Sequence, residues 1–557
     1  RNPASAEVMF LNGLMTEGRG NQLDAITSYD RTLRIDPLHV RARVNRGLAR
    51  VRLGLPEIAL SDQTHSIIID PENREAYINR GLILLMSGDW EKSSRDQSRS
   101  LILDPMQAEA YTLLGLCMTR LNHESMALLL HRRAIAIDPG LAEAYVNLGS
   151  AIYDQQFFLD ALRPLSLGLM ISPHSVGGQS HLLHRKNQLC LWSHRKETLD
   201  DIRNCVMVKD VAQDPFALLS FLDDPLLHLK AALLASSRVP IVAARFADSR
   251  DDCWGKIRIG YFSADFHDHA TLHLAAEMLE LHDRERFEIF LFSFGPDPKD
   301  PWRERAMKAC EKFLDLRAAS IGEVVSCARN LKLDIAVDLK GFTEDSRPEI
   351  FKARVAPVQI SYLGYPGTSG LPEMDYIIAD AHVIPEEFFE FYTEKVIQLP
   401  DAYQTNCRHR NIAPVKQSRG DLGLPHDGFI FCSFNASHKI SPEMFEAWIR
   451  ILKRVPQSVL WILINDATAR SNLLEWAKSL CLDANRIVFC SNLPVEAHLG
   501  RLSQADLLLD TFPYNAHTTA SDALRMGLPV LTLSGKSFAS RVAGSLLKVC
   551  GCLLYTS

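Results

Sequence analysis

Small and apolar positions recur at a fixed interval through the first third of the chain. One apolar position repeats every 34 residues, at Leu33, Ile67, Leu101, Ile135 and Leu169. Glycines keep the same interval at Gly13, Gly47, Gly81, Gly115 and Gly149, and Asp-Pro pairs keep it at Asp36-Pro37, Asp70-Pro71, Asp104-Pro105 and Asp138-Pro139. Three series in one register indicate a repeated structural unit.

A period of 34 residues is typical of tetratricopeptide repeats, each of which is a pair of antiparallel helices. We therefore predict an α-helical superhelix of about five repeats over residues 1–174. The small residues let the paired helices approach closely, and the prolines end one repeat and begin the next. Gly20, Gly54 and Gly88 lie where the first helix of a repeat must turn into the second.

The concave groove of such an array usually binds another protein. Asn45, Asn79 and Asn147 occupy one position on the helices predicted to face this groove. A row of asparagines can hydrogen-bond the backbone of an extended peptide without reading its sequence. The alternative is that they are ordinary solvated helix residues.

The repeat register is lost between residues 175 and 253, where amphipathic helical segments follow one another. We expect this helical connector to pack the repeats against the rest of the chain. Nothing in it indicates a catalytic site.

After Trp254 the pattern changes to short apolar runs separated by helical stretches. The first series of predicted strands comprises Ile257–Phe262, Phe287–Phe294, Leu333–Leu339, Val358–Leu363, Tyr376–Ala379 and Val396–Pro400. The second comprises Phe429–Phe434, Val459–Leu463, Ile487–Phe489, Leu507–Leu509 and Val530–Leu533. This alternation predicts two doubly wound α/β domains, over residues 254–404 and 422–557, joined by a polar linker over 405–421. Many nucleotide-sugar transferases have two such Rossmann-like domains facing each other across a cleft.

Composition narrows the class of protein. The 557 residues are 47% hydrophobic and 23% charged, as in a globular chain of several domains. A net charge of -6 argues against a general nucleic-acid binder. The 12 cysteines include no CxxC pair, so we expect reduced thiols and a cytoplasmic location. No apolar run is long enough to span a bilayer, so we expect no membrane partner. The chain begins at Arg1 and ends abruptly at Ser557, and we expect it to be a fragment.

Two stretches of the second α/β domain carry the clearest candidate chemistry. Phe431–Ile440 and Leu507–Leu524 each leave a predicted buried strand through polar residues and enter a predicted helix. Ligands of open α/β sheets bind at the carboxyl ends of the strands. Lys439 and the run His517-Thr518-Thr519 lie there, and together with the free N–H groups of a helix they predict a phosphate or diphosphate site.

Several motifs together resemble the protein O-GlcNAc transferase family, including its bacterial relatives and the plant SPINDLY branch. They are GYFSADFHDHATLHL (Gly260–Leu274), VDLKGFT (Val337–Thr343), APVQISYLGYPGTSG (Ala356–Gly370), MDYIIAD (Met374–Asp380), FNASHKI (Phe434–Ile440), LKRVPQSVLWIL (Leu452–Leu463) and DTFPYNAHTTASDAL (Asp510–Leu524). The short linker is similar to that of bacterial members. The resemblance implies a GT-B fold and inverting transfer of a sugar from UDP-GlcNAc to Ser or Thr of an acceptor protein, with neither a metal nor another cofactor.

The resemblance also implies roles for individual residues. Lys439, His517, Thr518 and Thr519 would bind the diphosphate, and Lys439 would neutralise it as it leaves. Asp522 would hold the ribose or orient His517, and His498 would contact the nucleobase. The remaining candidates are the acid/base residue His269, for which a substrate phosphate is the alternative, and the sugar-binding residues Thr343, Leu363 and Gly364.

Three departures from animal members leave the donor open. Val495 replaces a lysine, Tyr514 replaces a cysteine and Ala436 replaces a glutamine that contacts the base. A second hypothesis is therefore that the chain transfers a sugar from another nucleotide sugar, such as GDP-fucose. His517 argues against the pattern of the SPINDLY branch, which lacks this histidine. A third is a repeat scaffold whose transferase domain only senses a nucleotide sugar. The sequence does not indicate the oligomeric state or the acceptor.

Overall fold

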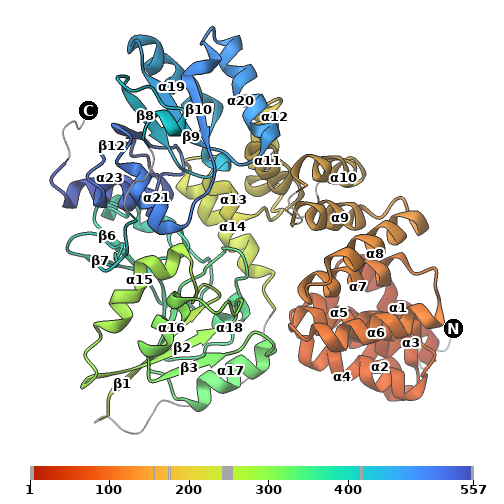
Figure 1. The fold of residues 1–557 in the computed structure, drawn as a ribbon. Coiled ribbons are helices and arrows are strands. Elements are labelled where there is room, and N and C mark those ends of the chain that lie inside the picture. Colours follow the sequence, from red (N-terminus) through yellow and green to blue (C-terminus); the bar gives the residue numbers. More distant parts are fainter. Residues whose placement is uncertain are drawn as a thin grey trace.

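The computed structural model describes residues 5–154, 157–173, 175, 177–240, 255–413 and 418–552. The expected boundary between connector and first α/β domain, near residues 253 and 254, lies outside these residues, as do both chain ends. A helical array, a helical connector and two parallel sheets follow one another along the chain (Figure 1). Within the described ranges, no helix is both long enough and apolar enough to cross a membrane.

The array consists of paired helices, as the 34-residue period predicts. The described pairs are α1 (Ala6–Gly18) and α2 (Gln22–Ile35), α3 (Val40–Arg52) and α4 (Pro56–Ile69), α5 (Arg74–Met86) and α6 (Trp90–Leu103), α7 (Ala108–Arg120) and α8 (Glu124–Ile137), and α9 (Ala142–Asp154) and α10 (Phe158–Ile171). Gly20, Gly54 and Gly88 have φ of +81°, +74° and +76°, which makes them the left-handed turns between the two helices of a pair. A Cβ on Gly47 would lie 2.3 Å from the Gln63 side chain, so the glycine series is needed for close helix packing.

The connector consists of α11 (Gly178–Gln188), α12 (Arg195–Met207), α13 (Pro215–Leu219) and α14 (Pro225–Ser237). It contacts both sheet domains. Trp192 packs on Trp476 of the second domain, with ring centroids 5.3 Å apart. In α14, the Ser236 hydroxyl donates to the Gly370 carbonyl of the first domain at 2.6 Å. The connector therefore sets how the two sheets are placed.

The first sheet has the strand order β3-β2-β1-β4-β5-β6-β7, all parallel. Its strands are β1 (Ile257–Ser263), β2 (Phe287–Ser293), β3 (Lys312–Asp315), β4 (Ile335–Asp338), β5 (Val358–Ser361), β6 (Tyr376–Asp380) and β7 (Lys395–Leu399). Its helices are α15 (Ala270–Glu280), α16 (Pro301–Lys308), α17 (Ile321–Asn330) and α18 (Pro348–Lys352). The hydrophobic pattern missed only β3, because this short edge strand has exposed ends and no buried residue.

The second sheet has the order β10-β9-β8-β11-β12, again all parallel. Its strands are β8 (Ile430–Ser433), β9 (Val459–Leu463), β10 (Ile487–Cys490), β11 (Leu507–Leu509) and β12 (Val530–Leu531). Its helices are α19 (Pro442–Arg454), α20 (Ala467–Ser479), α21 (Val495–Leu502), α22 (Thr518–Arg525) and α23 (Val542–Val549). The strand order reverses between β1 and β4 in one sheet and between β8 and β11 in the other. Ligands of doubly wound folds bind at such switch points.

Candidate active site

Lys439 lies at the switch point of the second sheet. A short 3-10 turn, Ser437–Lys439, follows β8 and carries the side chain toward the loop after β11. There Nζ donates to the Asn515 carbonyl at 3.2 Å and lies 3.7 Å from the centroid of the Tyr514 ring. Burial lowers the pKa of Lys439 to about 8, against the opposing effect of Asp510. A partly buried cation with one carbonyl and one aromatic face as neighbours can bind an anionic ligand.

The start of α22 faces the same place. His517 is the N-cap residue, and its side chain makes no capping bond to the helix. The first N–H groups of α22 are therefore left for an anion, beside the half-buried Thr518 and Thr519. His517 Nε2 bonds the Ala539 carbonyl at 3.2 Å, and burial followed by the charge of Lys439 holds the imidazole pKa well below its usual value. The structure thus brings Lys439 and His517 together, as the sequence predicted.

His498 lies on α21 with a partner that sequence reasoning missed. Arg501, one turn later, donates from Nε to His498 Nδ1 at 3.0 Å, so the neutral ring carries its proton on Nε2. Burial, Arg501 and Arg410 lower the pKa of His498 to about 4, in that order of effect. The ring lies edge-on to Phe434, whose centroid is 5.6 Å away. An uncharged Nε2–H beside an aromatic ring suits contact with a nucleobase.

Asp522 is engaged by a residue of the linker. Arg410 Nη1 lies 2.5 Å from Asp522 Oδ1, and both side chains are buried. Among the described residues, no hydrogen bond joins Asp522 to His517. We refer below to the candidate nucleotide-binding residues Lys439, His498, His517, Thr518, Thr519 and Asp522 together as the nucleotide site.

His269 lies at the switch point of the first sheet, after β1, as the N-cap of α15. Its Nδ1 accepts from the Thr271 N–H at 3.2 Å and lies 3.5 Å from Asp265 Oδ2. Lys340, which sequence reasoning missed, donates to both Asp265 oxygens at 2.9 and 3.0 Å. Burial lowers the pKa of His269, with Asp265 opposing and Lys340 assisting. The imidazole is neutral and 43% exposed, so it is accessible to an acceptor.

The candidate sugar residues lie between the two switch points. Thr343 Oγ1 donates to the Lys340 carbonyl at 2.8 Å, and a Cβ on Gly364 would lie 1.8 Å from the Leu339 carbonyl oxygen. Leu363 precedes this contact with φ of +67°. The neighbours Phe342 and Tyr365 pack with Leu219 and with Tyr514, the residue beneath Lys439. The cluster joins the carboxyl edges of both sheets, as the predicted facing arrangement requires.

Comparison with known proteins agrees with this geometry. The model of glycosyl transferase family 41 matches residues 230–416 and 404–555, which together are more than half of the chain. The chain belongs to glycosyl transferase family 41. It is 33% identical to the probable UDP-N-acetylglucosamine–peptide N-acetylglucosaminyltransferase SEC of Arabidopsis thaliana, over 66% of this chain and 40% of that protein.

This family 41 chain is also similar to a second plant protein and to a solved bacterial structure. The probable transferase SPINDLY of Petunia hybrida is 30% identical over 55% of this chain and 33% of its own length. A mutant of Thermobaculum terrenum O-GlcNAc transferase superposes with a TM-score of 0.62 at 27% identity, covering 86% of each chain. The latter match spans the array and both sheets, and it shows that the family 41 chain has the GT-B arrangement behind helical repeats. The chain spans about 40% or less of the curated relatives named here.

The asparagine row of the family 41 chain lies on the array, apart from the nucleotide site. Asn45 is on α3, Asn79 on α5 and Asn147 on α9, and each is half-buried. No hydrogen bond of these three side chains is found within the described ranges. Their amides are therefore available to a ligand or to solvent.

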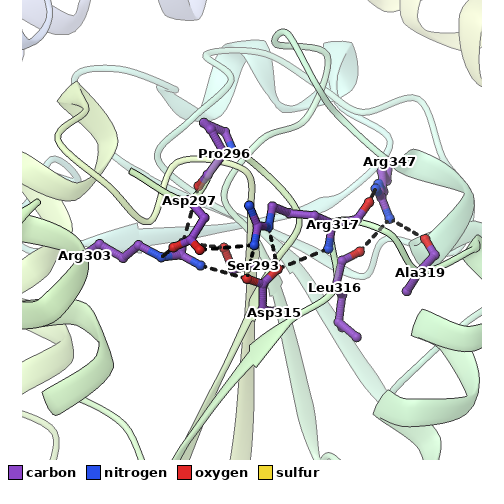
Figure 2. Close-up of polar contacts among 9 residues, drawn as sticks. All are labelled: Ser293, Pro296, Asp297, Arg303, Asp315, Leu316, Arg317, Ala319 and Arg347. Carbon is purple, nitrogen blue, oxygen red and sulfur yellow. Dashed lines mark hydrogen bonds and ion pairs between the residues drawn. The ribbon is translucent and has the colours of Figure 1, made fainter. Parts of the chain in front are cut away.

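The array meets the first sheet domain at its third repeat. The Ile321 N–H donates to the Ser87 carbonyl at 3.3 Å, and the Arg347 guanidinium lies 5.8 Å from the Trp90 ring centroid. A polar groove of about 770 Å³ lies beside this contact, between α6 and the loop after β3. Figure 2 shows the wall formed by the sheet domain, where Arg317 pairs with Asp315 and Asp297. Arg347 donates to backbone carbonyls in the same wall.

Asn435 is a further residue that sequence reasoning missed. It lies two residues after the end of β8, is buried, and has no hydrogen-bond partner for either amide atom within the described ranges. A buried amide without partners is costly, so this one points to a ligand or water at the nucleotide site. Its position at the carboxyl end of a predicted strand is the signal that could have identified it.

Proposed function

We propose that this chain transfers GlcNAc from UDP-GlcNAc to Ser or Thr hydroxyls of acceptor proteins, with inversion at the anomeric carbon and without a metal. The observation that carries the proposal is the partly buried Lys439 ammonium at the open N-terminus of α22. A fixed cation and a helix N-terminus can neutralise a leaving diphosphate. The names of the relatives support GlcNAc as the sugar and a peptide as the acceptor.

The transfer is a single displacement. The acceptor hydroxyl oxygen attacks the anomeric carbon as the bond from that carbon to the β-phosphate oxygen breaks, and UDP leaves toward Lys439 and α22. The acceptor's proton goes to a base on the acceptor side. In this proposal Thr343, Leu363 and Gly364 hold the sugar, while His498 and Asp522 hold the nucleoside.

Two groups can take the proton. His269 is on the acceptor side, but its Nδ1 accepts from Thr271, which places the proton of the neutral ring on Nε2. To act as a base through Nε2, the ring must first exchange the roles of its nitrogens. A phosphate oxygen of the donor needs no such change, so the hydrogen bond from the Thr271 N–H to Nδ1 favours the phosphate and gives His269 the role of a hydrogen-bond donor to the acceptor.

The repeats would recruit the acceptor. Asn45, Asn79 and Asn147 offer amides to an extended peptide, and the polar groove between α6 and the first sheet domain supports a path from the array toward the sheets. Two arginines of the groove are already paired with carboxylates, Arg317 with Asp315 and Asp297 and Arg95 with Glu91.

Calorimetric titration of UDP and GDP in EDTA tests the proposal, with Lys439→Ala as the variant and Lys453→Ala, an exposed lysine of α19, as the matched control. We expect UDP to bind, Lys439→Ala to weaken it and Lys453→Ala to leave it unchanged. Preference for GDP would favour the other nucleotide-sugar reading. UDP binding without transfer to any peptide would favour the sensing scaffold. A folded chain that binds neither nucleotide would overturn the proposal.

A further inference from the structure

The linker between the two sheet domains is held from both sides. On the side of the first domain, Glu277 of α15 accepts from the Arg408 N–H at 2.5 Å, and Arg305 of α16 donates to Cys407 Sγ at 3.1 Å. On the side of the second domain, Arg525 of α22 donates to the Cys407 carbonyl at 2.9 Å. The Ala413 N–H donates to the Glu496 carbonyl of α21 at 3.1 Å. Residues 406–413 are therefore a fixed wedge between α15 and α22.

Arg410 is the buried residue of this wedge. Its side chain is 3% exposed, and Nη1 holds Asp522 at 2.5 Å. Its Nε and Nη2 are buried as well, and within the described ranges neither has a hydrogen-bond partner. A charged guanidinium with buried, unused donors is unfavourable unless a ligand or water accepts from them. The wedge makes it difficult for the side chain to escape to solvent.

Arg410 lies nearer to the nucleoside end of the nucleotide site than to its diphosphate end. Its charge contributes to the lowered pKa of His498 on α21, after burial and Arg501. It also contributes, after burial, to the lowered pKa of His273 on α15, where the hydrogen bond to Asp268 opposes the shift. Lys439 and His517, at the diphosphate end, show no such contribution from Arg410. The guanidinium therefore lies among α15, α21 and α22, nearer to His498 and Asp522 than to the phosphates.

We propose that Arg410 is a donor-binding residue of this transferase, holding Asp522 through Nη1 and donating from Nε and Nη2 to the nucleoside of a nucleoside diphosphate sugar. The acceptors on the ligand would be ribose hydroxyl oxygens or a carbonyl oxygen of the base. The proposal rests on the proposed function, because it assumes that the nucleotide site binds such a donor. It also gives the linker a function: the segment that joins the two domains completes the site between them.

The test compares ligands that have and lack the nucleoside. UDP and UMP are titrated by calorimetry, and inorganic diphosphate by competition with UDP, into the full chain and into Arg410→Ala, Arg410→Lys and Arg408→Ala. We expect Arg410→Ala to weaken UDP and UMP by about 10- to 100-fold while inorganic diphosphate changes less than about twofold. Arg410→Lys keeps a charge for Asp522 but lacks the forked donors, so it should show the same selective loss. Arg408, which is exposed on the same wedge, is the control and should change neither affinity.

The outcomes separate this inference from the proposed function. If Lys439→Ala weakens UDP but both Arg410 variants bind UDP and UMP as the wild type does, the inference is overturned and the proposed function stands. Equal loss of all three ligands, together with a lower melting temperature in Arg410→Lys, would mean that Arg410 is structural and would also overturn it. A folded wild-type chain that binds no UDP would overturn both.

Discussion

The charge of Lys439 predicts how UDP affinity depends on pH. The Lys439 side chain is partly buried, and its pKa is lowered to about 8 because burial penalises the charged form. Only the protonated lysine attracts a diphosphate, and its fraction falls as the pH rises through 8. UDP affinity should therefore decrease above neutral pH. A lysine at the surface, with a pKa near 10.4, would show no change over this range.

The size of the effect follows from the same pKa. With a pKa of about 8, the protonated fraction is about 0.9 at pH 7.0 and about 0.24 at pH 8.5, so Kd should rise about fourfold. The terminal phosphate, with a pKa near 6, stays ionised over this interval. Lys439→Met removes one charge-assisted hydrogen bond worth about 1.5–3 kcal/mol, which is about 10- to 150-fold in Kd.

The assay is calorimetric titration of UDP at pH 7.0 and pH 8.5, in EDTA and at constant ionic strength, into the wild type and Lys439→Met. We expect the fourfold change in the wild type and a weak, pH-independent Kd in the variant. Any other titrating group would change Kd with pH in both proteins, so Lys439→Met is the control for such groups. A flat wild-type profile, or the same slope in both proteins, would refute the placement of Lys439 against the diphosphate.

Three further outcomes are expected. His269→Ala should lower kcat by about tenfold, since the hydrogen bond from the Thr271 N–H to Nδ1 favours a phosphate base; a loss of about 10³-fold with a changed pH–rate profile would instead make His269 the base. Gly364→Ala should lower the free energy of unfolding by about 1–3 kcal/mol in urea denaturation, because its Cβ would meet the Leu339 carbonyl at 1.8 Å; an unchanged value would contradict that contact. The pKa of His438, whose Nε2 is buried, is lowered to about 3, first by burial and then by the charge of Lys439. Below pH 6.5 the folded state therefore binds fewer protons at this residue than the unfolded state does. The free energy of unfolding should fall by about 1.4 kcal/mol for each unit by which the pH is lowered. Melting temperatures measured between pH 6.5 and pH 5 should therefore fall less in His438→Asn than in the wild type.

The sequence predicted the elements that repeat or that bury apolar runs. The 34-residue series located the helix pairs of the array, and the apolar runs located all strands but β3. Lys439 and His517 were predicted as neighbours because both follow predicted buried strands, and parallel strands bring their carboxyl ends to one edge. The local pattern was therefore enough to bring together candidate residues that lie shortly after a strand.

What the sequence missed depends on contacts between distant segments. Arg410 lies in a stretch that reads as a polar linker, and its partner Asp522 is 112 residues away. The pairing of Lys340 with Asp265 spans 75 residues and leaves no local pattern. Tyr514 was noted only as a departure from animal members, whereas the structure places its ring 3.7 Å below the Lys439 ammonium. Such roles require the fold, because no periodicity encodes which side chains meet.

The most direct measurement is sugar transfer itself. The chain is incubated in EDTA with UDP-GlcNAc labelled in the sugar and with a library of Ser- and Thr-containing peptides, beside Lys439→Met and Lys453→Ala. The account predicts GlcNAc on Ser or Thr with inverted anomeric configuration in the wild type and Lys453→Ala, and its loss in Lys439→Met. Transfer that persists in Lys439→Met, or a wild-type chain that binds UDP yet labels no peptide, would contradict it.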